Sequence, residues 1–356
     1  MSSIADRPIE RALVLAGGGG RGAYQVGVCQ VLDKMSWRPD MVLGNSIGAT
    51  NGAMLIAPNP DLGLSGIALL TQVWGCEMSN DLLHKTSPDW PKPLRKVIDL
   101  VIKVLQALQK PSRTAEADRL LLELIEALHD LPDEERENII QKMLGKPCLM
   151  EREDWKRLLE QKVDFHLLNQ RCPPYYGVAV TDVLTGAPRY FWNHVPPGVE
   201  GTASEITADH VMASSSIPGI YRATRLEGRE WWDGACVANA PIGPAIDSGA
   251  TDIVVVLMTP WHPEPEGKGV PLPPQAKSTT VGDALERFLD WMMLAPLRSE
   301  LKRKRPEQTV RIVAPKKVQG VVQNIDYDPQ DSKVLIRQGR KDAGRILSGF
   351  TNSVPQ

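Results

Sequence analysis

Residues 12–28 read ALVLAGGGGRGAYQVGV and join an apolar run, four consecutive glycines and an amphipathic segment. The run RALVLA (11–16) has the length and composition of a buried parallel strand, and residues 23–35 carry apolar side chains at helical spacing. Glycine is costly to order and reaches backbone conformations that other residues cannot adopt. Four glycines at a strand-to-helix junction therefore indicate that the backbone must come close to a ligand or a reacting atom.

The next segment repeats this strand–turn–helix scheme. Residues 39–57 read PDMVLGNSIGATNGAMLIA, for which we expect a strand over 41–43 and a helix over 49–57. Two such units in succession predict an α/β fold with a mainly parallel central sheet and helices packed on it.

Composition excludes several classes of protein. The 356 residues are 42% hydrophobic and 24% charged, with a net charge of −2, so the chain lacks the polybasic character of nucleic-acid-binding proteins. Its five cysteines form no C-x-x-C pair, which favours reduced thiols in a cytosol-like compartment. No run approaches the roughly 18 apolar residues of a membrane span, and the N-terminus does not have the pattern of a secretory signal. We expect a cytoplasmic protein, with peripheral contact to a membrane left open.

Residues 60–172 differ in pattern from the strand–turn–helix units before them. In this stretch apolar residues recur at helical spacing over 93–110, 117–131 and 152–163. We expect a helical insertion whose stripes either pack against the sheet or form a mobile cover over a site. Strand signals return at 175–191, 250–260 and 309–315, and residues 208–220 are expected to form a helix closed by Pro218 and Gly219.

The glycine loop formally satisfies the G-x-G-x-x-G pattern of dinucleotide-binding folds through Gly17, Gly19 and Gly22. That interpretation also requires an acidic residue at the end of the next strand to hold a ribose. Here Asp40 precedes the strand, and the strand ends in GNSIG (44–48). The pattern therefore disfavours a dinucleotide site.

GNSIG matches G-x-S-x-G, and its position between a predicted strand and a predicted helix is the context that gives this motif meaning. A sharp turn there would expose the hydroxyl of Ser46, while Gly44 and Gly48 would remove Cβ atoms that collide with the turn. Ser46 is thus a candidate nucleophile, and a serine nucleophile needs a base.

Two residues compete for the role of that base. His262 is the only histidine that follows Asp233, as the order of an α/β-hydrolase triad requires, but it lies in the proline-rich stretch 261–280. Asp233, in WWDGACVANAP (231–241), is the second candidate, unless it only caps its own turn.

An ordered set of motifs resembles the patatin-like phospholipase family. The set consists of GGGGRG (17–22), GNSIG (44–48), ASSSIPGIY (213–221) and DGACVANAP (233–241). The family usually has two glycines after the aspartate, whereas this chain has Gly234 and Ala235. The stretch 147–161 fits the family in style but carries no diagnostic residue.

The resemblance implies a three-layer α/β/α fold and a lipid acyl hydrolase of the phospholipase A, lysophospholipase or carboxylesterase type. It implies a dyad without histidine, in which Ser46 attacks the acyl ester and Asp233 accepts its proton. The backbone of the glycine loop would form the oxyanion hole, with Gly18, Gly19, Gly20 and Arg21 as donors. The motif residues Gly17, Gly22, Gly44, Gly48, Gly234 and Ala235 would support the site.

On this basis residues 11–260 are expected to form the catalytic domain, with 60–172 as a helical insertion, and residues 261–356 to complete the same domain. No cofactor is implied, and the absence of zinc spacing and of a calcium loop predicts no metal. A catalytically idle lipid-binding or regulatory protein on the same fold is the alternative. Trp74, Trp90 and Trp291 are candidates for membrane contact, but burial of most tryptophans in the core is the favoured interpretation.

Asp233 poses a chemical difficulty, because an exposed aspartate has a pKa of about 3.9 and is a weak base. Desolvation by Trp231 or Trp232 would raise the pKa of Asp233. Neighbouring side chains in a strand alternate between faces, so at most one of these tryptophans lies on the side of the carboxyl group.

Overall fold

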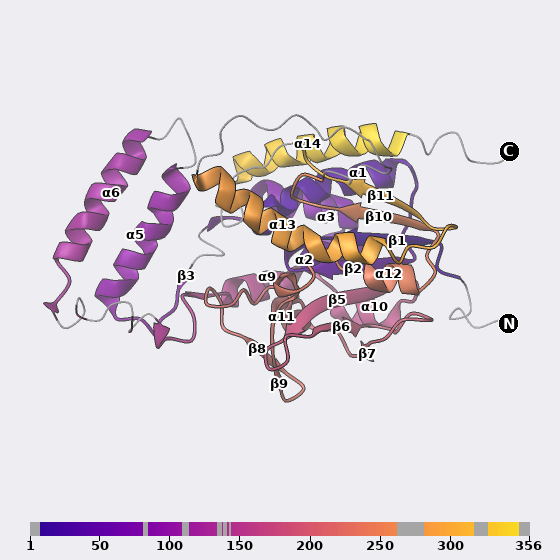
Figure 1. Ribbon diagram of the computed structural model, residues 1–356, viewed down its shortest axis with the longest axis horizontal. Helices are drawn as coiled ribbons and strands as arrows, with labels where there is room; N and C mark the ends of the chain where they lie inside the picture. The colour runs from indigo at the N-terminus through magenta and orange to yellow at the C-terminus, as the bar shows by residue number, and fades with distance from the viewer. Residues whose placement is uncertain are drawn as a thin grey trace.

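The computed structural model describes residues 8–80, 85–108, 114–133, 137, 141, 144–261, 281–316 and 327–348 (Figure 1). Its largest element is a nine-stranded sheet. In spatial order the main path is β11 (Thr309–Val313), β10 (Asp252–Val256), β1 (Arg11–Leu15), β2 (Met41–Asn45), β5 (Tyr175–Asp182), β6 (Pro188–Trp192) and β7 (Thr202–Ala203). The remaining two strands, β8 (Thr224–Leu226) and β9 (Arg229–Asp233), form a hairpin that pairs with β5 through β9.

The first five strands along this path run parallel, from β11 to β5, and β6 and β9 then pair with β5 in the antiparallel sense. The expected α/β fold with a mainly parallel sheet is therefore confirmed. Every residue of β2 and β5 is buried, as expected for central strands covered on both faces.

Apolar side chains of alternating residues divide between the two faces of the sheet. In β1, Leu13 and Leu15 belong to one core cluster and Ala12 and Val14 to the other. The first cluster packs against α1 (Ala23–Lys34), α2 (Ile47–Ile56), α3 (Gly66–Gln72) and α14 (Pro329–Leu347). The second packs against α12 (Gly243–Asp247) and α13 (Val281–Leu301). The result is three layers, helices–sheet–helices.

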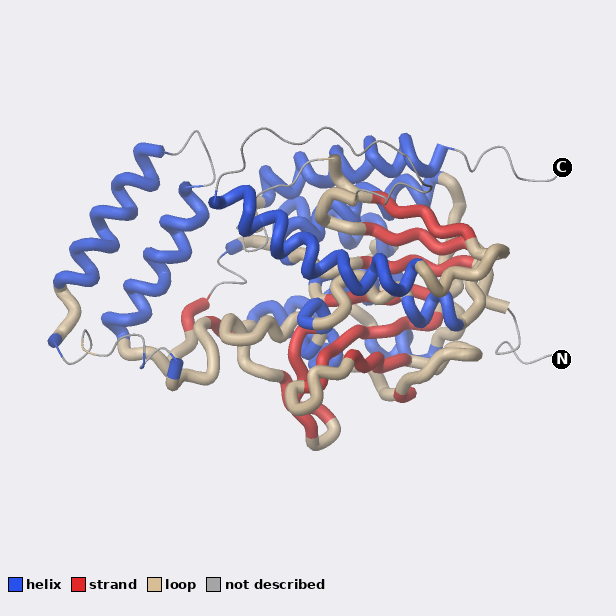
Figure 2. The backbone as a smooth tube through the Cα atoms, in the orientation of Figure 1, coloured by secondary structure: helices blue, strands red, loops and turns tan. Residues whose placement is uncertain are grey.

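The helices of the middle segment divide into two groups. Figure 2 shows α5 (Lys92–Leu108) and α6 (Thr114–His129) side by side and apart from the sheet. They bury their apolar stripes against each other in a separate cluster, whereas α9 (Glu153–Lys162) and α10 (Phe165–Gln170) contribute to the cluster on the sheet. The short strands β3 (Lys85–Thr86) and β4 (Met150–Glu151) pair where the chain leaves and re-enters the main body.

The helix expected over 208–220 is shorter in the structure, where α11 ends at Ala213 (Ala208–Ala213). Three consecutive serines follow, and the Ser215 and Ser216 hydroxyls donate back to the carbonyl oxygens of Val211 and Met212. Such side-chain bonds compete with helix propagation, and Pro218 prevents its resumption. In the part of the chain that the structure describes, no helix is both long enough and apolar enough to cross a membrane.

Candidate active site

Ser46 occupies a sharp turn between β2 and α2. Its backbone adopts φ +53° and ψ −125°, a combination that L-residues rarely adopt and that stores strain. The turn requires both flanking glycines. A Cβ at Gly44 would lie 2.3 Å from the Cα of Ala49, and one at Gly48 would lie 2.2 Å from the carbonyl oxygen of Leu15. The spacing of GNSIG is therefore a steric requirement of this turn.

Asp233 reaches the same place along the edge of β5 that β2 occupies, just beyond the end of β2. It ends β9, which pairs with β5, and β5 in turn pairs with β2. The backbone of Asp233 is held at both ends, since its N–H donates to the Ser216 carbonyl at 3.0 Å and its carbonyl oxygen accepts from Thr181 Oγ1 at 2.9 Å. The Ser46 hydroxyl acts on the Asp233 carboxyl and lowers its pKa, and both residues are buried, 6% and 3% exposed.

Burial raises the pKa of the Asp233 carboxyl to about 6, and this desolvation is the largest effect. The Ala235 amide, which donates to Asp233 Oδ1 at 2.8 Å, opposes the rise, as do hydrogen bonds from Ser46 and Asn45 and the charge of Arg152. The buried Trp231, two residues earlier in the strand, shares the face of Asp233. The carboxylate is thus a stronger base than an exposed aspartate while still ionised at neutral pH.

The glycine loop lies directly against Ser46. A Cβ at Gly17 would lie 3.2 Å from the Cβ of Ser46 and 2.6 Å from Asn239 Oδ1. Gly19–Gly22 form a short 3-10 turn that leads into α1, and Gly19 has φ +53°. Within the described residues, the amides of Gly18, Gly19 and Gly20 donate to no backbone carbonyl, so they are available to an incoming oxygen.

Arg21 differs from the three glycines before it. Its amide donates to the Gly18 carbonyl at 3.2 Å, and its guanidinium donates through Nη1 to the Met258 carbonyl at 3.0 Å. The side chain is 5% exposed and ties the loop to the end of β10. These contacts give Arg21 a role in supporting the loop.

Three polar residues that the sequence analysis did not single out complete the site. Ser214 Oγ accepts from the Ser46 amide at 2.8 Å and donates to the Ala179 carbonyl at 2.6 Å. Asn45 Nδ2 donates to the carbonyl oxygen of Asn239 at 3.3 Å and lies 3.4 Å from its side-chain oxygen. These residues sit inside the recognised motifs, which is the one signal in the sequence that could have found them.

With this geometry in place, comparison with known proteins identifies the family. The model of the family described as "Patatin-like phospholipase" matches residues 13–246, which is more than half of the chain. The chain belongs to the patatin-like phospholipase family. Members are typically serine hydrolases of lipids, so membership implies a lipid substrate and a place in lipid metabolism.

Solved structures give more distant matches. VipD from Legionella pneumophila is 13% identical, with a TM-score of 0.44 over 96% of this chain and 67% of that one. The type III effector ExoU is 13% identical, with a TM-score of 0.38 over 98% of this chain and 54% of that one. ExoU from Pseudomonas aeruginosa in complex with SpcU is 17% identical, with a TM-score of 0.35 over 96% and 53%. This patatin-like chain thus spans about half to two thirds of the length of these proteins, and no curated protein matches it.

No described histidine is seen to act on the Ser46–Asp233 pair of this patatin-like protein. None of the largest influences on the Asp233 pKa comes from a histidine among the described residues. His210 is buried in a capping box with Thr207 at the start of α11. His262, the histidine of the alternative triad, lies outside the described residues. The described residues also contain no cluster of three or more His, Cys, Asp or Glu side chains suited to a metal ion.

The three tryptophans considered for membrane contact have different environments. Trp74 is fully buried, donates to Asn51 Oδ1 at 2.8 Å and stacks on Tyr327. Trp90 is buried and donates to the Cys148 carbonyl at 3.0 Å. Burial in the core, the interpretation that the sequence favoured, therefore holds for these two, because both indoles are packed and hydrogen-bonded inside the protein. Trp291 is exposed on α13.

Proposed function

We propose that this protein hydrolyses carboxylic esters of lipids, as a phospholipase A, lysophospholipase or carboxylesterase, through a Ser46–Asp233 dyad. The observation that carries the proposal is the meeting of three features at one point. A strained serine turn, a buried carboxylate whose pKa that serine lowers, and a glycine loop with available amides all converge there. The strained backbone of Ser46 and the buried carboxyl of Asp233 each carry a stability cost.

In this mechanism Ser46 Oγ attacks the ester carbonyl carbon while its proton passes to the Asp233 carboxylate. Amides of Gly18, Gly19 and Gly20 donate to the oxygen that becomes negative in the tetrahedral intermediate, and Arg21 supports their loop. Collapse of the intermediate breaks the ester bond, and Asp233 returns the proton to the leaving alcohol. Asp233 then deprotonates a water that attacks the acyl-enzyme, and it returns this proton to Ser46 Oγ as the bond to the fatty acid breaks.

The first test compares two serine-to-alanine changes at helix N-caps. Ser46 caps α2 without a side-chain bond, whereas the exposed Ser65 caps α3 by accepting from the Ala68 amide at 3.3 Å. Ser46→Ala is expected to abolish hydrolysis of nitrophenyl acyl esters and covalent labelling by a fluorophosphonate, with unfolding unchanged. Ser65→Ala should lose about 1 kcal/mol of stability but keep wild-type activity.

Turnover by Ser46→Ala at a near wild-type rate would refute the assignment. A wild-type protein that binds phospholipid vesicles but neither labels nor hydrolyses would instead support an idle lipid-binding protein. For the active enzyme, a panel of phospholipid, lysophospholipid and neutral ester substrates with products identified by mass spectrometry would define the headgroup preference.

A further inference from the structure

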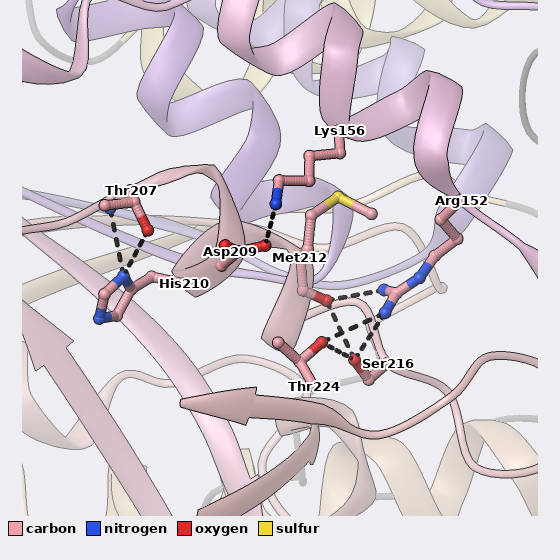
Figure 3. A network of polar contacts seen from close by, with 8 residues as sticks. All are labelled: Arg152, Lys156, Thr207, Asp209, His210, Met212, Ser216 and Thr224. Atoms are coloured by element: carbon pink, nitrogen blue, oxygen red, sulfur yellow. Dashed lines mark hydrogen bonds and ion pairs between the residues drawn. The ribbon is translucent and has the colours of Figure 1, made fainter. Parts of the chain in front are cut away.

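Arg152 connects the middle segment of the chain to the candidate site. It is the N-cap residue of α9, and Figure 3 shows its guanidinium pointing at the end of α11 and the serine run that follows. Nη1 donates to the Met212 carbonyl at 2.7 Å, and Nη2 donates to Ser216 Oγ at 2.8 Å and Thr224 Oγ1 at 3.3 Å. The planar guanidinium also lies over the Tyr221 ring, 4.8 Å from its centroid.

Ser216 links this network to the proposed base. Its hydroxyl accepts from Arg152, and its carbonyl oxygen accepts from the Asp233 amide at 3.0 Å. One residue therefore joins Arg152 to Asp233 through two hydrogen bonds. Two residues earlier, Ser214 accepts from the Ser46 amide. The segment fixed by Arg152 thus holds the backbone of both members of the dyad.

The charge of Arg152 acts on the same carboxyl group. The ionisable groups that face Asp233 are Arg152, Tyr327 and Cys236, and Tyr221 lies between Arg152 and Tyr327. Burial raises the pKa of Cys236 to about 11, that of Tyr221 to about 12 and that of Tyr327 well above its ordinary value, so these groups are neutral near pH 7. Burial lowers the pKa of Arg152 to about 10, which still leaves it protonated. Arg152 is the charged group among the largest influences on the pKa of Asp233 within the described residues.

We propose that Arg152 is a positioning residue for the dyad, which fixes Ser216 beneath Asp233 by hydrogen bonds and favours the ionised carboxylate by its positive charge. The inference rests on the proposed function for its kinetic consequences only. It assigns a role to a stretch, 147–161, in which the sequence carried no diagnostic residue.

Three variants separate charge, hydrogen bonding and the packing of α9. Arg152→Met removes the charge and the donors while keeping a long apolar side chain. Arg152→Lys keeps the charge but loses the planar fork that serves Met212 and Ser216 together. Lys156→Met is the matched control, because Lys156 also ties α9 to α11, through Asp209 at 2.7 Å, and does not act on Asp233 (Figure 3).

The readout is the pH dependence of kcat/KM for a water-soluble acyl ester. The sign follows from charge, since removing a cation raises the pKa of a neighbouring carboxyl group. In Arg152→Met the acidic limb should move up by about half to one pH unit, with an additional loss of kcat at high pH. In Arg152→Lys the limb should stay near its wild-type position while kcat falls at every pH. Lys156→Met should leave both the limb and kcat unchanged.

A second measurement does not depend on catalysis. The Asp233 carboxyl is titrated by carbon-13 NMR in the Ser46→Ala background, with its signal assigned by its absence in Asp233→Asn. Arg152→Met should raise the titration midpoint by the same half to one unit. If the Asp233 titration midpoint moves but the protein with Ser46 intact hydrolyses no ester, the inference on Arg152 stands and the proposed function fails. If Arg152→Met hydrolyses esters but neither the acidic limb of its kcat/KM profile nor the Asp233 titration midpoint moves, the role of Arg152 is overturned. If Arg152→Met does not fold, the value of kcat in Arg152→Lys provides the test, and a wild-type kcat would overturn the role.

Discussion

Ser46 and Asp233 each adopt a state that lowers the stability of the folded protein. Ser46 holds a positive φ without the glycine that would relieve it, and Asp233 holds a carboxyl group in an interior that disfavours its charge. The nearby hydrogen bonds offset only part of that penalty, as the raised pKa of Asp233 shows. Such costs are expected where a group is kept for chemistry and not for folding.

This cost predicts how stability depends on pH. Because the Asp233 pKa is about 6 in the folded state, against about 3.8 ordinarily, the folded protein binds its proton more tightly. The free energy of unfolding therefore falls as pH rises from about 4 to 6, and the loss is complete above 6. Asn carries no charge, so Asp233→Asn should be more stable than wild type by about 1–3 kcal/mol at pH 8 and nearly equal at pH 4. Urea unfolding at the two pH values measures this difference, and a difference independent of pH would contradict the burial argument. The variant should also label very slowly with a fluorophosphonate.

At the residue scale the sequence predicted the members of the site better than their surroundings. Ser46, Asp233 and the glycines are marked by short motifs whose spacing is a steric necessity, as Gly44 and Gly48 show. Arg152 is invisible in the sequence, because its partners lie about 60 to 72 residues away and only the folded chain brings them together. The sequence favoured burial for most tryptophans but could not separate the buried Trp74 and Trp90 from the exposed Trp291, since composition does not say which large side chains are covered.

Among the elements, α1 and α14 make the closest helix pair. A Cβ at Gly27 of α1 would lie 2.1 Å from the Ile336 carbonyl oxygen, and one at Gly339 of α14 would lie 2.1 Å from the Tyr24 carbonyl oxygen. The two backbones therefore touch through two glycines, and Tyr24 also donates from its hydroxyl to Asp342 at 3.2 Å. Helical spacing over 23–35 predicted α1, but not which helix packs on it, because periodicity identifies a buried face and not its partner.

Two substitutions on α14 test this contact. Gly339→Ala places a methyl group against the α1 backbone and should destabilise the protein by about 1–3 kcal/mol. Gly344→Ala is the matched control, since nothing lies within 4 Å of a Cβ at that position. It should be neutral or stabilise the helix by up to about 1 kcal/mol. Thermal or urea unfolding of the two variants decides the matter, and equal effects would mean that α1 and α14 are not in backbone contact in solution.

For the whole molecule, the order of strands in the sheet was beyond the reach of the sequence. Local patterns predicted strands over 11–16, 175–191, 250–260 and 309–315, and the structure contains β1, β5 with β6, β10 and β11 in those stretches. Their arrangement, with β10 and β11 on one side of β1 and β2 with β5 on the other, depends on long crossovers that leave no local signal. The domain division likewise stays a prediction. We propose that residues 261–356 complete the domain that begins at residue 11.

A truncated chain tests that proposal. The family match ends at residue 246, yet α14 and β11 cover α1 and β10, and apolar side chains of the C-terminal segment lie in both main clusters. They are Leu294, Leu297, Val313, Ala314, Tyr327, Leu335, Ile336, Ala343 and Leu347. Each large side chain of this kind contributes about 1.5–3 kcal/mol when buried, and a whole domain is stable by only about 5–15 kcal/mol. Residues 1–260 expressed alone should therefore show no cooperative thermal transition and should bind a hydrophobic dye such as anilinonaphthalene sulfonate. If residues 1–260 unfold cooperatively at a temperature within a few degrees of the full chain, residues 261–356 are not part of the domain. The domain would then end after β10.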